Sequence, residues 1–267
     1  MNGLRLYGRY VSVSWRSQMQ YPASFIATSI GAFATTITDF IAIWALFARF
    51  RQIEGWRFDE VALLYGVISV SFALADGLTR GFDVFGERFV KTGDFDRLLV
   101  RPRSTALQLL GYEFRATRIG RLAQGMLAWG VGVHLSSVDW TWTAWGTLLF
   151  AVLGGVALFS GILVLQATLA FWTVESLEIA NTLTYGGVEA GQYPLDIYAR
   201  WFRNFLTFVV PLACISYFPA ASVLGRVERT GVTGWLLPIT PAFGFVFLGG
   251  ALWVWGFGVR RYTSTGS

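Results

Sequence analysis

The residues that could do chemistry are few, and their types and spacing argue against most enzymes. The chain has one histidine, His134, and one cysteine, Cys214, so it cannot form a two-histidine metal site, a CxxC redox pair or an intrachain disulfide. A phosphate-binding P-loop needs the pattern GxxxxGK[ST], whereas the residue before Lys91, the only lysine, is Val90. We therefore expect no catalytic residue, no metal site and no cofactor in this chain.

Acidic residues within apolar segments are the next candidates for a function. Asp39 interrupts the apolar run Ala23–Phe47, and a carboxylate inside a membrane is costly unless it has a partner or a role. It could attract a cationic substrate or pair with an arginine of another span; the alternative is an aspartate held by hydroxyl groups and water at a subunit interface. Glu175 and Glu178 would share one helix face and could line a translocation path or pair with cytoplasmic arginines.

A third group of residues lies in the one long polar segment, 79–120. Three phenylalanines recur there at three- and four-residue spacing: Phe82, Phe85 and Phe89. This spacing predicts a short helix over Phe82–Lys91 with an aromatic face, which Gly93 can end, and Pro102 stops the segment that follows. Exposed aromatic rings would suit the docking of a soluble partner, and the alternative is an interfacial helix whose phenylalanines lie in lipid.

The composition places these residues in a membrane protein. Of 267 residues, 54% are hydrophobic and 14% are charged, whereas a soluble domain has about 25% charged residues. A membrane helix needs about 20 mostly apolar residues, and six crossings are the natural count. Five of them are predicted at residues 22–47, 61–78, 119–138, 142–166 and 236–259.

The fifth crossing has two alternatives on physical grounds alone. In the first, Trp201–Ala221 crosses the membrane. In the second, residues 170–191 cross outward, and the chain from Tyr193 to Gly225 dips into the outer leaflet and returns. The distribution of arginines mildly favours the first alternative, and the second must place two glutamates in a span, so neither is excluded.

Basic residues predict the orientation, because they mark the cytoplasmic side of short loops. Both termini and the loop after the second span are therefore expected to be cytoplasmic; the basic residues are Arg5, Arg9 and Arg16, nine residues between Arg80 and Arg121, and Arg260 and Arg261. Apolar residues recur at helical spacing near the N-terminus, which predicts an amphipathic helix on the membrane surface or a plain extension of the first span: Leu4, Tyr7, Val11 and Trp15.

Several other residues are expected to have structural roles. Asp76 is followed by Arg80 at i+4, and the simplest expectation is an ion pair. Gly154, Gly155 and Gly161 allow a close approach of helices. The net charge of +5 does not indicate a nucleic-acid partner, since the basic residues alternate with membrane spans.

Two stretches carry a resemblance to a known family. Gly93–Pro102 (GDFDRLLVRP) resembles the "G-x-hydrophobic-D-x-L-L-x-R-P" stretch of type 2 ABC exporter permeases, and Tyr193–Phe202 resembles the element that follows their fifth span. The resemblance implies an all-α integral membrane protein with six transmembrane helices and an N-terminal amphipathic elbow helix. It also implies the second alternative above, with a fifth span at 170–191, a re-entrant outer segment at 192–230 and a cytoplasmic coupling loop at 79–118.

The same resemblance implies a function. The chain would be a permease subunit of an ATP-driven exporter in the bacterial inner membrane. It would pair with a second permease chain, identical or related, and with a separate soluble ATPase that holds ATP and Mg²⁺. The ATPase-coupling residues would be Phe82, Phe85, Arg88, Phe89, Lys91, Gly93, Asp94, Arg97 and Arg101, and the substrate path would include Asp39, Glu175 and Glu178. The alternatives are a membrane scaffold or assembly subunit without transport, and a secondary transporter, which would usually show internal repeats.

Overall fold

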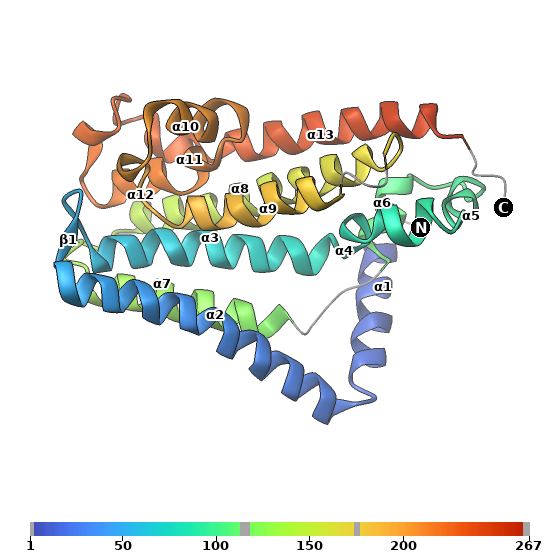
Figure 1. The fold of residues 1–267 in the computed structure, drawn as a ribbon, viewed down its shortest axis with the longest axis horizontal. Helices are drawn as coiled ribbons and strands as arrows, with labels where there is room; N and C mark the ends of the chain where they lie inside the picture. The colour runs from blue at the N-terminus through green and yellow to red at the C-terminus, as the bar shows by residue number, and fades with distance from the viewer. Residues whose placement is uncertain (1–2, 113–117, 174–176, 264–267) are drawn as a thin grey trace.

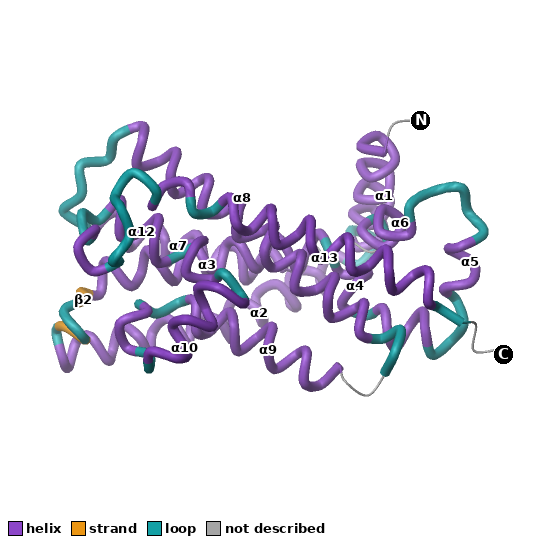
Figure 2. The backbone as a smooth tube through the Cα atoms, turned by 90° about the horizontal axis from the view of Figure 1, so that it is seen from above, coloured by secondary structure: helices purple, strands orange, loops and turns teal. Residues whose placement is uncertain are grey.

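The computed structural model describes residues 3–112, 118–173 and 177–263. Its long helices lie roughly along one axis (Figure 1). Long apolar runs are helical in lipid because a helix satisfies its backbone polar groups by its own hydrogen bonds. These helices are α2 (Pro22–Phe50), α3 (Phe58–Leu78), α7 (Ile119–Leu135), α8 (Trp142–Leu169), α9 (Leu177–Gly191) and α13 (Ala242–Arg261). Both chain ends lie toward the same end of the molecule in Figures 1 and 2.

Four helical segments of the described chain are long and apolar enough to cross a membrane: Pro22–Phe50, Phe58–Leu78, Trp142–Leu169 and Leu237–Arg261. A fifth candidate is the pair Arg200–Val209 and Leu212–Val223, which is bent by 71°. At the other predicted spans, α7 has 17 residues and α9 has 15. The chain is therefore an all-α, multi-pass membrane protein.

The helix α3 forms the centre of the bundle. Within its most apolar window 89% of the residues are buried, against 17% for α2 and 22% for the last span. It packs against α7 and α8 along its length and against α9 on another side. The outer helices therefore present most of their apolar surface to the surroundings, as expected for a protein whose solvent is lipid.

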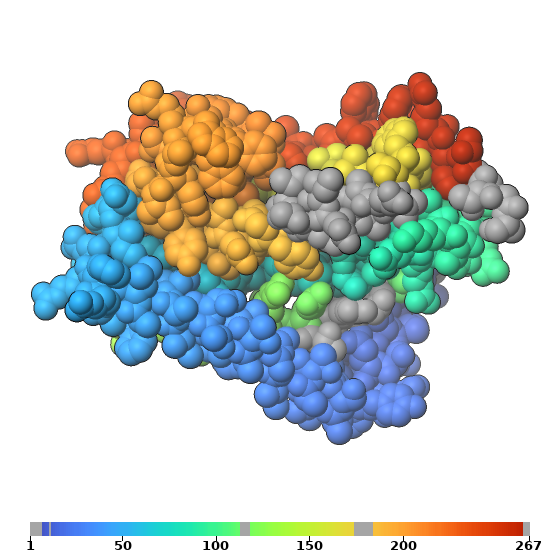
Figure 3. Space-filling model, viewed as in Figure 1, coloured from blue at the N-terminus to red at the C-terminus, as the bar shows by residue number. Residues whose placement is uncertain are grey.

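The ends of the bundle differ in character. At the end with the termini, the chain forms α4 (Arg80–Asp83), the π-helix η1 (Gly86–Val90), α5 (Phe95–Leu99) and α6 (Thr105–Leu110). The predicted helix Phe82–Lys91 is thus helical but interrupted at Val84, and it ends at Val90, before the turn that leads to Gly93, whose φ is +72°. The helix α1 (Gly3–Gln18) stands at a steep angle to α2 (Figure 1), and both project from the body in the space-filling view (Figure 3).

The opposite end contains the strands β1 (Gln52–Ile53) and β2 (Trp56–Arg57), paired antiparallel, and a series of short helices. These short helices are η3 (Leu195–Ile197), α10 (Arg200–Asn204), η4 (Phe205–Val209), α11 (Leu212–Ile215), α12 (Tyr217–Val223), η5 (Val227–Arg229) and η6 (Leu237–Ile239). The chain over 201–221 is therefore not one straight helix, while α9 runs beside α8. The first predicted alternative thus corresponds to the bent pair, and the second corresponds to α9.

Small residues bring α8 close to α13, as the sequence predicted for its glycines. A Cβ atom on Gly154 would overlap the carbonyl oxygen of Pro241, and one on Gly161 would overlap the ring of Phe247. On α3, Ser71 lies equally close to Gly155. These contacts leave no room for a larger side chain.

The Gly154 contact gives a first prediction. Gly154→Ala is expected to lower the free energy of unfolding by about 1 to 3 kcal/mol, because the added methyl group must push the backbone of α13 away. Gly146→Ala on the same helix is the matched control, since its Cβ would meet nothing within 4 Å. Thermal unfolding of both variants in detergent checks the difference; equal midpoints would contradict the packing argument.

Candidate coupling surface and substrate pocket

A buried aromatic cluster fixes the polar loop to the bundle. We call it the loop cluster, and its members are Phe82, Phe85, Phe89, Phe95, Phe171 and Trp255. The ring of Phe85 lies 4.9 Å from that of Trp255 on α13 and 5.2 Å from that of Phe171, just after α8. The indole Nε1 of Trp255 also donates a hydrogen bond to Thr105 Oγ1, at 3.1 Å. The loop is thus held to two long helices by ring contacts and a hydrogen bond.

This cluster corrects the expectation of exposed phenylalanines. The exposed fractions are 1% for Phe82, 0% for Phe85 and 4% for Phe89, so these rings face neither a soluble partner nor lipid. The spacing correctly indicated one aromatic face. It could not indicate that this face meets aromatic residues about 80 to 170 positions later, because helical periodicity carries no information on tertiary partners.

The outer side of the loop carries charge. Of the residues predicted to couple to an ATPase, the exposed ones are Arg88, Lys91, Arg97 and Arg101, and Glu87 is exposed beside them. Gly93 and Asp94 are half-buried, and Asp94 forms an ion pair with Arg97 at 3.0 Å. An open surface depression is lined by Val84, Glu87, Arg88, Thr92 and Asp94. The loop therefore presents a mostly basic surface on an apolar support.

The ion pair predicted between Asp76 and Arg80 is wrong. Asp76, 2% exposed, pairs with Arg118 at 2.7 Å, and Arg80 pairs with Asp83. The helix α3 ends at Leu78, before Arg80, so the i+4 geometry of a continuous helix does not hold there. The pair of Asp76 and Arg118 instead joins the end of α3 to the start of α7.

Asp39 lines a polar pocket of about 280 Å³ between α2, α3, α7 and α9. This polar pocket is lined by Thr36, Asp39, Ala42, Ile43, Tyr65, Ser69, Phe72, Arg121, Gln124, Tyr185, Val188, Glu189, Gln192 and Tyr193. Burial raises the pKa of the Tyr193 phenol, and the carboxylates of Glu189 and Asp39 raise it further, so this hydroxyl stays protonated. In the described chain, no group of three His, Cys, Asp or Glu residues could hold a metal ion.

Of the other predicted path residues, Glu175 and the side chain of Glu178 lie outside the part of the chain that the structure describes. Sequence reasoning missed Glu189 and Gln124. Only their positions in the sequence could have indicated a role. Glu189 lies at the outer end of the predicted fifth span, and Gln124 lies three residues after Arg121 in the predicted third span.

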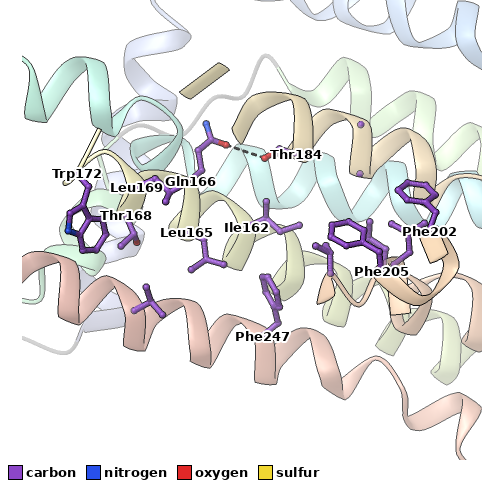
Figure 4. Close-up of a pocket in the computed structure, with 16 residues that line it drawn as sticks. Ile162, Leu165, Gln166, Thr168, Leu169, Trp172, Thr184, Phe202, Phe205 and Phe247 are labelled. Carbon is purple, nitrogen blue, oxygen red and sulfur yellow. Dashed lines mark hydrogen bonds between the residues drawn. The ribbon is translucent and has the colours of Figure 1, made fainter. Parts of the chain in front are cut away.

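A second cavity, of about 530 Å³, lies between α8, α9, α13 and the bent pair (Figure 4). Its walls are almost entirely apolar, with Phe202, Phe205 and Phe247 among them. Its polar side chains are Gln166, Thr168 and Thr184, and Thr184 Oγ1 donates to Gln166 Oε1 at 3.1 Å. The apolar cavity and the polar pocket thus lie on different sides of α9.

At the opposite end, Asp196 joins the hairpin to the short helices. It accepts hydrogen bonds from Trp56 Nε1 at 2.8 Å and from the Tyr217 hydroxyl at 3.0 Å. Nearby, Arg226 pairs with Glu60 at the start of α3, at 2.8 Å. These contacts fix the bent pair against α3 and the hairpin.

The apolar helices, the bent pair and the polar loop together define a multi-pass membrane protein. Comparison with family models gives its class: residues 33–266 match the ABC-2 family transporter proteins. The chain belongs to this family, and this supports a permease role. The comparison with curated proteins gave no match, and neither did the comparison with solved structures.

Proposed function

We propose that this chain is one of two permease subunits of an ATP-driven exporter in the bacterial inner membrane, coupled to a separate ATPase that binds ATP and Mg²⁺. In this proposal α2, α3, α7, α8, α9 and α13 are the six crossings, and both termini are cytoplasmic. The helix α1 lies at the inner membrane surface as an elbow. Membership of the ABC-2 family supports the transporter role, and no residue of this chain is given a catalytic role.

The observation that carries the proposal is the attachment of the charged loop to the long helices. Arg88 and Lys91 are exposed, while Phe85 and Phe89 beneath them are buried in the loop cluster. An ATPase that moves this surface would move α13 through Trp255, because the buried ring of Phe85 packs directly against it. Coupling is then mechanical, by the tilt of packed elements.

The second permease subunit would cover α2. Its apolar side chains are widely exposed, among them Ile30 at 62% and Trp44 at 55%. Asp39 is exposed on the same helix, and a carboxylate facing lipid is unfavourable unless protein or water faces it. A second copy, or a related chain, would enclose Asp39 in a path between the two subunits.

The docking prediction follows from the charged surface. In the double variant Arg88→Glu and Lys91→Glu, copurification of the ATPase is expected to fall at least about tenfold, because reversed charges repel an acidic partner surface. Arg200→Glu is the matched control, since Arg200 is exposed at the opposite end of the bundle. Quantitative mass spectrometry of the tagged chain, gently extracted from its own host, measures the ratio.

The same measurement tests the proposal itself. Two permease chains with two ATPase chains are the expected composition, and the masses of the permease chains show whether they are identical. A wild-type chain that purifies without any P-loop ATPase would contradict the proposal and favour a scaffold without transport. Unchanged copurification in the double variant would contradict the docking surface only.

A further inference from the structure

The polar pocket contains a buried amide that no well-formed hydrogen bond holds. Gln124 is 1% exposed and lines the pocket from α7. Its side chain lies beside the Tyr65 hydroxyl, and its Nε2 atom has no partner in good hydrogen-bond geometry. A buried donor without a partner is unfavourable, because it has lost its hydrogen bonds to water. Within a pocket of about 280 Å³, this donor points to a ligand that supplies an oxygen acceptor.

The charges around the pocket are arranged unevenly. Asp39 on α2 and Glu189 on α9 are exposed at its edge, whereas Arg121 on α7 is half-buried, 5.2 Å from the centre of the Phe72 ring. In the described part of the chain, no ion pair joins Arg121 to either carboxylate. The pocket thus has two acids at its edge, and one cation beside the Gln124 amide at its wall.

Aromatic rings also line the pocket. Arg121 already lies over Phe72, which leaves Tyr65 and Tyr185, and the faces of such rings attract organic cations. Two carboxylates and aromatic faces suit a protonated or quaternary amine, while Arg121 and Gln124 suit an oxygen acceptor or oxyanion. A ligand that fits both regions of the pocket therefore carries a cationic amine and an oxygen acceptor or oxyanion.

We propose that the polar pocket binds an ammonium group joined to an oxyanion, as in phosphocholine, and that this is the class of compound the permease carries. The inference rests on the proposed transport function, because it names the substrate of that transport. The same chemistry occurs in soluble zwitterions and in the headgroups of zwitterionic lipids, so the experiment includes one probe of each kind.

The test is calorimetric titration of the full chain, with its copurified partners, in phosphatidylglycerol nanodiscs. Phosphocholine represents the headgroup alone and dodecylphosphocholine the amphiphile; inorganic phosphate is the control probe. We expect saturable binding of at least one zwitterion, and none of phosphate. Asp39→Asn and Gln124→Leu are each expected to weaken it about tenfold or more, while Asp139→Asn, an exposed loop residue, leaves it unchanged.

Each outcome has a defined meaning. Binding of phosphocholine, with or without binding of dodecylphosphocholine, supports the site and a soluble ligand if the two pocket variants weaken it. Binding of dodecylphosphocholine alone, with the same weakening, supports the site and a lipid source. The inference is overturned by the absence of saturable binding, or by equal affinities in wild type and pocket variants. Such a failure leaves ATPase copurification intact, so it is distinguishable from a failure of the proposed function.

Discussion

Arg118→Leu is expected to lower the free energy of unfolding by about 3 to 5 kcal/mol, because it leaves the carboxylate of Asp76 buried without its cationic partner. Asp76 is 2% exposed, and its Oδ2 lies 2.7 Å from Nε of Arg118. The pair links the C-terminal end of α3 to the start of α7. Its loss affects the centre of the bundle because α3 is the most buried of the candidate spans. Thermal unfolding in detergent, followed by intrinsic fluorescence, measures the effect.

Two controls separate the unpaired charge from other effects. The double variant Asp76→Leu and Arg118→Leu removes both charges and is expected to regain more than half of the lost stability. Arg97→Leu breaks the exposed pair with Asp94, in which the side chains are 82% and 41% exposed; its cost is expected to be below about 1 kcal/mol. A double variant as unstable as the single one would contradict the argument.

The long helices could be predicted from the sequence because one physical requirement fixes them. A membrane segment must be apolar over about 20 residues, and this property belongs to each segment alone. The predicted spans 61–78 and 142–166 therefore differ from α3 (58–78) and α8 (142–169) by only a few residues. The role of Gly154 was predictable for the same reason, since a small side chain marks a close approach whatever its partner.

Partners between distant segments could not be predicted in this way. The spacing of three phenylalanines indicated a shared face, but whether Phe85 met water, lipid or Trp255 depended on where α13 lies. Asp76 was assigned to Arg80 because that residue is near in sequence, whereas the structure pairs it with Arg118 across a loop.

The polar pocket shows the same limit for a functional site. Asp39 was identified because a charge within an apolar run is costly on its own. Gln124 and Glu189 acquire their meaning only from α7 and α9 lying beside α2 and α3. A site assembled from several helices is a property of their packing, and a single sequence gives no measure of that packing.

Trp255→Ala is expected to release the loop from α13 and to cost about 3 to 5 kcal/mol, because it removes a fully enclosed ring. Trp255 is 3% exposed, contacts Phe82, Phe85 and Phe171, and holds Thr105 by a hydrogen bond. Trp253, two positions earlier on the same helix, is 77% exposed, so Trp253→Ala is the matched control. Its effect on stability is expected to be small.

Limited trypsin digestion measures the release directly, because Arg88, Lys91 and Arg97 are exposed cleavage sites on the loop. Cleavage there is expected to be at least about tenfold faster in Trp255→Ala, since proteolysis follows the population of the open loop. Cleavage after Arg200, at the opposite end, serves as the internal reference. A loop cut at the wild-type rate would show that the loop cluster does not hold it, and mechanical coupling through α13 would then have no support.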